Sequence, residues 1–99
     1  MAKQVIWSAR AHTDRKEILE YWIHRNKSKT YSRKLNHLFN EAVQLVAMYP
    51  KIGKRTDVEF VRIKIVRDYF IIYEETDSDI HILTIWNSHQ DPKNLEWEF

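Results

Sequence analysis

The sequence has no cysteine, one glycine and two prolines in 99 residues, and it has no long uninterrupted apolar run. Without cysteine the chain cannot form a disulfide framework or use a thiolate as a nucleophile. A membrane-spanning helix needs about 20 predominantly apolar residues, so we expect no membrane association. The first residues also lack the basic start and apolar region of a signal peptide, which indicates a cytoplasmic protein.

Hydrophobic residues make up 43% of the sequence and include four Trp, five Tyr and four Phe, which is enough for one apolar core. We therefore interpret residues 1–99 as a single domain. The net charge is +2, but residues 24–50 and 51–67 each carry +4, whereas residues 68–79 carry −5. This asymmetry permits a nucleic-acid or acidic-protein partner, although a solvated basic face explains a modest excess more often.

A β-hairpin is predicted within the stretch from Asp68 to Pro92. Two runs rich in β-branched and aromatic residues, 69–73 and 80–86, flank a polar segment. Both alternating faces of each run are apolar, so these strands should lie mid-sheet or have neighbours above and below. Apolar and polar residues alternate over residues 58–66, which predicts a further strand with one solvent-exposed face. Its apolar face carries Val61, Ile63 and Ile65.

Two helices are predicted upstream of these strands. Apolar residues at helical spacing indicate a first helix from Ala9 to about Asn26. A second helix should begin with Ser28 or Thr30 as its N-cap and end before Pro50, because a residue that precedes proline is pushed out of the α region. The short connection between the two helices predicts an antiparallel helical hairpin.

A short first strand over residues 3–8 completes the order β-α-α-β-β-β. This order predicts an α+β fold, with a twisted, mainly antiparallel sheet of about four strands packed against the helical hairpin. The first strand could pair at an edge or insert between later strands. The single glycine, Gly53, is expected to supply a positive φ angle. Leu38, Phe39, Ala42, Leu45 and Val46 should cover a sheet face formed by some of Ile63, Ile71, Ile82 and Trp86.

Seven segments of the chain carry a resemblance to a known family. They are Trp7-Ser8-Ala9, Ile18–Trp22, Tyr49–Lys54, Val61-Arg62, Tyr69–Tyr73, Ile80–Ile85 and His89–Pro92. Their order and spacing resemble the RelE/ParE superfamily of toxins from type II toxin–antitoxin systems. The resemblance implies a growth-inhibiting toxin of a plasmid-stabilisation module, neutralised by a cognate antitoxin, in a homodimer or a toxin–antitoxin hetero-oligomer. It implies no cofactor and no metal.

Within the superfamily the chain is more similar to the ParE-like branch, whose members poison DNA gyrase without known catalysis of their own. The two long helices favour this branch, and so does Phe70, because nuclease members carry an arginine at that position. One alternative is a RelE/YoeB-like endoribonuclease that cleaves mRNA in the ribosome without a metal ion. Another is an inactive relative that only binds nucleic acid.

If the chain is a nuclease, His89, Arg62 and Arg67 are the expected catalytic residues. His89 could transfer protons near neutral pH, and arginines could hold the phosphate as charge builds. Each residue also has a structural alternative to a catalytic role. His89 would be a solvent-exposed surface residue, and Arg62 would form a cross-strand ion pair with Glu74 or Glu75. Substrate-binding candidates are Lys51, Lys54, Arg55, Lys64 and Tyr69.

A second basic run lies at the predicted turn between the two helices. Such a run is most often a solvent-exposed end, and that is its interpretation here. The histidines at positions 12, 24, 37 and 81 lack carboxylate or cysteine partners at metal-ligand spacing, so they are assigned no role. The basic run consists of Arg25, Lys27, Lys29, Arg33 and Lys34.

Overall fold

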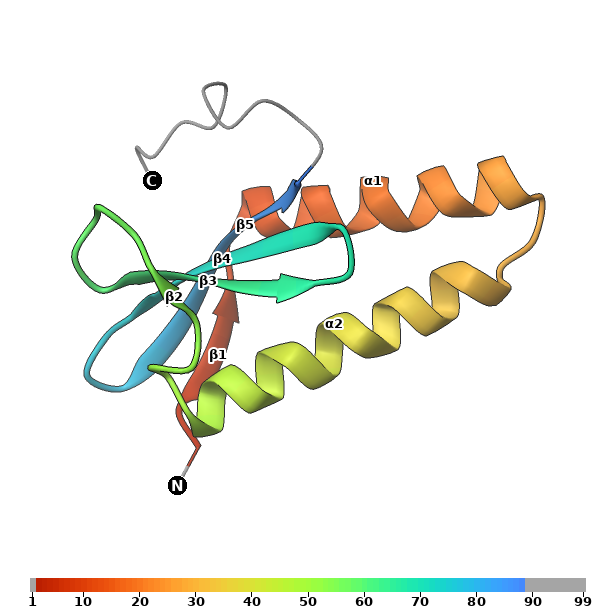
Figure 1. The fold of residues 1–99 in the computed structure, drawn as a ribbon. Helices are drawn as coiled ribbons and strands as arrows, with labels where there is room; N and C mark the ends of the chain where they lie inside the picture. Colours follow the sequence, from red (N-terminus) through yellow and green to blue (C-terminus); the bar gives the residue numbers. More distant parts are fainter. Residues whose placement is uncertain (1, 89–99) are drawn as a thin grey trace.

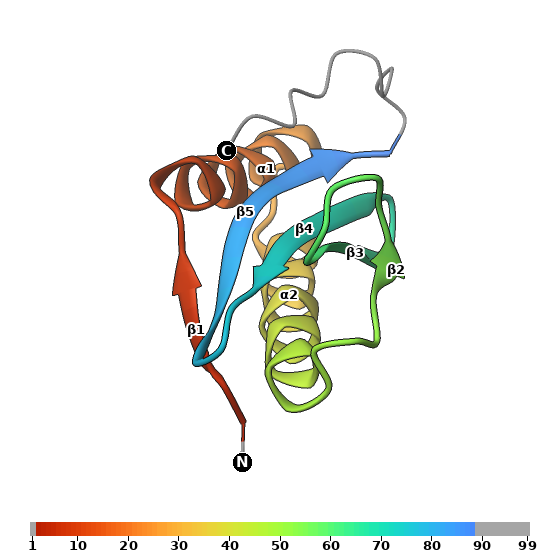
Figure 2. The same cartoon turned by 90° about the vertical axis from the view of Figure 1, so that its left-hand side faces the viewer.

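The computed structural model describes residues 2–88 of the chain and contains a five-stranded sheet with both helices on one face (Figures 1 and 2). This arrangement confirms the predicted α+β fold and element order, with a two-residue strand added to the expected four. The elements are β1 (Gln4–Trp7), α1 (Ala9–Asn26), α2 (Thr30–Met48), β2 (Lys54–Arg55), β3 (Val61–Val66), β4 (Tyr69–Glu75) and β5 (Asp79–Asn87).

The sheet has the strand order β1-β5-β4-β3-β2. Its pairs are antiparallel except for β1, which lies parallel to β5 with Val5 opposite Ile80. The first strand is therefore an edge strand. The predicted hairpin is formed by β4 and β5, and each of them has a neighbouring strand on both sides, so both lie within the sheet as expected.

Helix α1 has the predicted bounds, and its N-terminus is capped by Ser8, whose Oγ accepts a hydrogen bond from the Ala11 N–H at 3.0 Å. The prediction of Ser28 or Thr30 as the cap of α2 was wrong. The cap is Lys29, without a side-chain hydrogen bond. Lys27 ends α1 with a left-handed φ of 50°, and only Ser28 and Lys29 then connect it to α2. Within this short connection the Ser28 hydroxyl accepts a hydrogen bond from the N–H of Thr30, the first residue of α2.

The main core lies between the helices and the sheet. Phe39, Ala42 and Val46 of α2 are buried there together with Ile71 and Ile82, as predicted. Ile63 and Trp86 are not part of this core, because they belong to a second apolar cluster around Val61 and Ile72. Leu45 was also expected to cover the sheet, but it remains 37% exposed at the edge of α2.

Strand β3 begins at Val61 rather than at the predicted Val58. Phe60 has a φ of 66°, a conformation that no regular strand allows. The Thr56 hydroxyl organises the preceding loop by accepting from the Val58 N–H at 3.1 Å and donating to the Val61 carbonyl at 2.9 Å. This local bonding replaces strand pairing over residues 56–60. Neither helix between residues 2 and 88 combines the length and apolar composition that a bilayer span requires.

Replacing Phe39 with alanine should lower the free energy of unfolding by about 3–5 kcal/mol, because the ring is fully buried and its removal leaves a cavity. Urea denaturation monitored by tryptophan fluorescence measures the loss. Phe60→Ala is the matched control, since that ring is 62% exposed. Equal losses in the two variants would contradict the packing described here.

Candidate functional site

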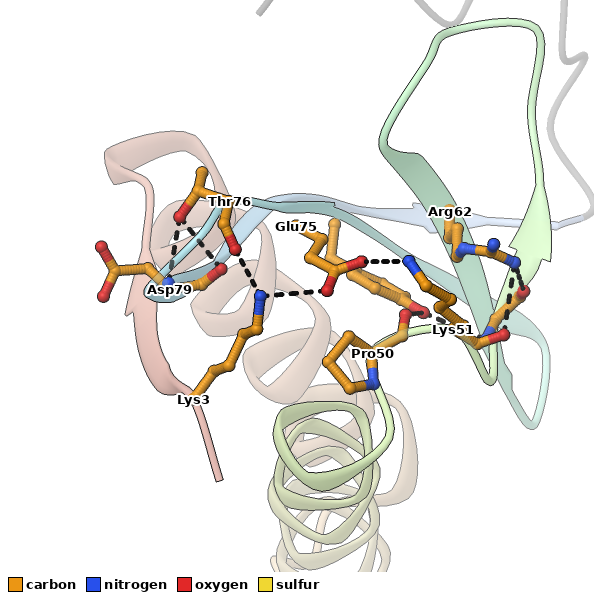
Figure 3. Close-up of polar contacts among 9 residues, drawn as sticks. Lys3, Pro50, Lys51, Arg62, Glu75, Thr76 and Asp79 are labelled. Carbon is orange, nitrogen blue, oxygen red and sulfur yellow. Dashed lines mark hydrogen bonds and ion pairs between the residues drawn. The ribbon is translucent and has the colours of Figure 1, made fainter. Parts of the chain in front are cut away.

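The turn after α2 is fastened to the centre of the sheet by one tyrosine. Tyr73, in β4, is fully buried, and its hydroxyl donates a hydrogen bond to the Pro50 carbonyl at 2.7 Å. The same oxygen accepts a hydrogen bond from the Gly53 N–H at 3.0 Å (Figure 3). Burial raises the pKa of this phenol above its usual value, which keeps the donating proton in place.

Gly53 does not have the predicted positive φ angle. The correct reason for glycine is close approach, because a Cβ atom at this position would lie 2.6 Å from the Tyr73 hydroxyl and 2.9 Å from the Ile63 carbonyl oxygen. Both distances are shorter than van der Waals contact. A side chain would push the turn away from β4, so the glycine is required by packing rather than by backbone conformation.

Arg62, in β3, binds the same turn from the other side. Its Nη1 donates to the Gly53 carbonyl at 2.9 Å and to the Lys51 carbonyl at 3.2 Å (Figure 3). The alternative in which Arg62 pairs with Glu74 or Glu75 is not found among the ion pairs of residues 2–88, and the guanidinium bonds these two backbone carbonyls instead. Together Tyr73 and Arg62 hold the turn over residues 50–53 in one position.

Glu75 joins the turn to the N-terminal strand. Its carboxylate lies 3.0 Å from the Lys3 ammonium and 3.1 Å from that of Lys51, with only 17% of its side chain exposed (Figure 3). The hydrogen bond from Lys3, followed by that from Lys51, lowers the pKa of Glu75 below its ordinary value. Glu75 is therefore a weak base at neutral pH, and its two cations tie the turn to residue 3.

The predicted cations do not converge on one site. Lys51, Arg55 and Arg62 line a hollow of about 190 Å³ beside Phe60. Lys64 and Arg67 lie instead along a groove of about 310 Å³ against α2, with Leu45 and Glu41 on its opposite wall. Lys54 is exposed on β2, opposite Ile63.

Two further predicted site residues, Tyr69 and His89, belong to neither group of cations. Tyr69 is only 4% exposed, and its hydroxyl accepts a hydrogen bond from the Trp22 indole at 2.8 Å, so its ring is not presented to a base. His89 lies outside the described residues. Within residues 2–88 no three His, Asp or Glu side chains are grouped so that they could hold a metal ion.

Phe70 and Arg62 project from opposite faces of the sheet. Arg62 pairs with Tyr73 of the helix-side core, whereas Phe70 pairs with Ile65 and Trp86, and side chains alternate between faces along a strand. The guanidinium of Arg62 therefore cannot replace an arginine missing at position 70. Phe70 belongs to an apolar surface on the face opposite the helices, which we call the open face and which consists of Ile63, Ile65, Phe70, Leu83 and Trp86 around buried Val61 and Ile72.

Sequence reasoning missed the part that Tyr73, Lys3 and Glu75 play in holding the turn. Tyr73 and Glu75 lie close together in β4, but their partners Gly53 and Lys3 are distant in sequence, and only the fold brings them to the same end of the sheet. The glycine after Pro50 was the one visible signal. It indicated a constrained turn, although not the hydroxyl that constrains it.

Two solved structures share this fold. The chromosomal ParDE TA system from P. aeruginosa aligns with a TM-score of 0.74 and 17% identity, over 87% of this chain and 96% of that chain. The E. coli DinJ-YafQ toxin-antitoxin complex aligns with a TM-score of 0.51 and 15% identity, over 88% and 93%. A search of curated proteins finds no match.

These two likenesses show that the chain shares its fold with proteins of toxin–antitoxin systems. Residues 5–92 match the family described as "ParE toxin of type II toxin-antitoxin system, parDE". The chain belongs to this ParE toxin family. It is therefore a toxin of the type II toxin–antitoxin class.

Gly53→Ala and Tyr73→Phe should each lower the free energy of unfolding, the first by steric overlap and the second by about 1–3 kcal/mol for a buried N–H left without its acceptor. The double variant should lose less than the sum, because removing the hydroxyl frees space for the new methyl group. Urea denaturation of all four proteins gives this coupling. Strict additivity would show that the two residues do not act on each other.

The pKa of Glu75 predicts a pH-dependent part of stability. Because the folded pKa lies below the unfolded value, the stabilisation is fully present above the ordinary value of 4.5 and is lost as the pH falls through the folded pKa. Thermal unfolding between pH 7 and pH 3 should therefore show a smaller decline for Glu75→Gln than for the unchanged chain. Asp77→Asn, at an exposed position in the next turn, is the control. Parallel declines would exclude the contribution of Glu75.

Proposed function

We propose that this chain inhibits growth by direct contact with DNA gyrase and is kept silent by a cognate antitoxin in the cytoplasm. Membership of the ParE toxin family supports a growth-inhibiting role within a toxin–antitoxin pair. The solved P. aeruginosa relative is titled as a ParDE system, which supports a paired antitoxin here too. The observation that carries the choice of gyrase is the apolar character of the open face.

The open face is suited to a protein surface. Phe70 and Trp86 lie opposite each other across β4 and β5, and Ile65 beside them is 43% exposed. Large apolar and aromatic side chains form the centres of protein–protein interfaces, where burial removes them from water. Phosphoryl-transfer chemistry would instead need fixed cations aimed at the reacting phosphate.

The cations of β3 do not meet that need. Arg62 and Lys64 share the face of β3 opposite to that of Phe70, and the Arg62 guanidinium already bonds two carbonyls. Removing one oriented group that stabilises a transition state typically costs about 10²–10³ in rate. A nuclease built on this sheet would lack such a group at position 70. Inhibition by contact requires none.

The test is a gyrase cleavage assay with the purified chain, gyrase and supercoiled plasmid. We expect linear DNA to accumulate after protein denaturation, because a stabilised cleavage complex leaves broken strands behind. Ile65→Glu should weaken this effect by at least about tenfold, since it places a charge in the apolar contact. Met48→Glu, at an exposed position on α2, should have no such effect.

The result opposed to this proposal is equally specific. If gyrase and its cleavage complexes are unaffected while the chain cuts mRNA at ribosomal A-sites in a translation extract, the function is ribonucleolytic. In that case His89→Ala should abolish the cuts. If Ile65→Glu and Met48→Glu inhibit gyrase equally, the open face is not part of the contact with gyrase.

A further inference from the structure

The far end of the helical hairpin carries charge of one sign. From Tyr21 to Asn40 the chain has no aspartate or glutamate, although 14 acidic residues occur elsewhere in the 99. These 20 residues form the end of α1, the connection and the first half of α2, which project beyond the sheet (Figure 1). The cationic tip, as we call this end, consists of Arg25, Lys27, Lys29, Arg33 and Lys34.

All five cations of the tip are exposed to solvent. Among residues 2–88 none of them takes part in an ion pair, and the Arg25 guanidinium only lies over the Trp22 ring at 6.0 Å. The nearest acidic side chain along α2, Glu41, already pairs with His37 at 2.9 Å. The positive charge of the tip is therefore not neutralised within the hairpin.

The acidic part of the molecule lies at the other end. The β4–β5 turn and its flanks carry Glu74, Glu75, Asp77 and Asp79, and Figure 1 shows this turn on the side of the sheet away from the α1–α2 connection. The total charge of +2 would give only weak attraction for a polyanion. Because the opposite charges are separated in space, the tip alone produces a local positive field.

We propose that the cationic tip binds the sugar–phosphate backbone of duplex DNA, independently of base sequence. Phosphate contacts need only flexible cations and hydrogen-bond donors at the surface. The tip offers these groups and little else: every exposed residue from His24 to Lys34 is polar. A protein partner would require an apolar or aromatic centre for its interface, which this surface lacks.

The aromatic residues of the hairpin favour a duplex over a single strand. Single strands are held by stacking successive bases on exposed rings. Trp22 and Tyr31 pack edge to face at 4.9 Å, and the Trp22 indole also donates to Tyr69. Among the Phe, Tyr and Trp residues of α1 and α2 only Tyr21 is exposed, so these large rings offer no series of stacking surfaces.

This binding goes beyond the proposed action on gyrase and does not depend on it, because the test contains no second protein. The purified full chain is titrated into a fluorescently labelled 24-base-pair duplex of mixed sequence, and anisotropy is recorded from 50 to 200 mM salt. The tip variant replaces Lys27, Lys29, Arg33 and Lys34 with Gln. The control variant lowers the net charge by the same four units at exposed positions outside the tip and outside the candidate site residues, through Lys16→Glu, Gln44→Glu and Met48→Glu.

We expect the unchanged chain to bind at 50 mM salt and the tip variant to bind at least about tenfold more weakly. The slope of log affinity against log salt should fall by about 0.9 for each phosphate contact removed. The control variant should stay within about threefold of the unchanged chain. A charge-preserving variant, with Lys and Arg exchanged at the four tip positions, should bind like the unchanged chain and excludes misfolding as the cause.

Three results would overturn the proposal. The first is no binding to the duplex at 50 mM salt. The second is an equal loss of affinity in the tip and control variants, which would show that general charge rather than the tip attracts DNA. The third is clearly tighter binding to a single-stranded RNA of the same length, or to an acidic peptide of the same charge, which would assign the tip to that partner.

Discussion

The buried hydroxyl of Tyr73 is the contact on which the position of the turn after α2 depends. A phenol taken out of water must keep its hydrogen bonds, and this one finds both partners in the turn that leaves α2. Because Tyr73 belongs to β4 at the centre of the sheet, these two hydrogen bonds fix Pro50 and Gly53 relative to the sheet. Arg62 then binds the fixed carbonyls, and the short β2 pairs beside it. One polar group in the core thus aligns a loop that has little regular structure of its own.

The rest of the molecule divides into regions with different physical properties. The helix side of the sheet is filled by Phe39, Val46 and the aliphatic residues of β4 and β5. The open face offers apolar side chains to a partner, whereas the far end of the helical hairpin offers only charge. A protein contact and an electrostatic contact could therefore be made at the same time without competing for the same surface. Separation of this kind allows each surface to change in sequence without disturbing the other.

Helix and strand positions could be predicted because their signals are local. Helical spacing of apolar residues marks both helices, Pro50 marks the end of α2, and runs rich in β-branched and aromatic residues mark β4 and β5. The site could not be predicted to the same extent, because its contacts join residues distant in sequence. Nothing local shows that Tyr69 bonds Trp22 or that Arg62 binds carbonyls rather than Glu74. The role of Gly53 was misjudged for the same reason, since the close atom belongs to residue 73. His89 lies outside the described residues, so its role stays a prediction.

The parallel pairing of β1 with β5 has a consequence for synthesis. β1 has no strand to pair with until residues 79–82 have been synthesised. The Ser8 hydroxyl likewise has no acceptor until the Leu83 carbonyl, to which it donates, has been made. Contacts between residues so far apart in the chain form late and slowly during folding. A growing chain therefore keeps β1 unpaired until β5 has been synthesised, and its sheet closes only then. The five-stranded sheet can therefore be complete only after β5 has left the ribosome.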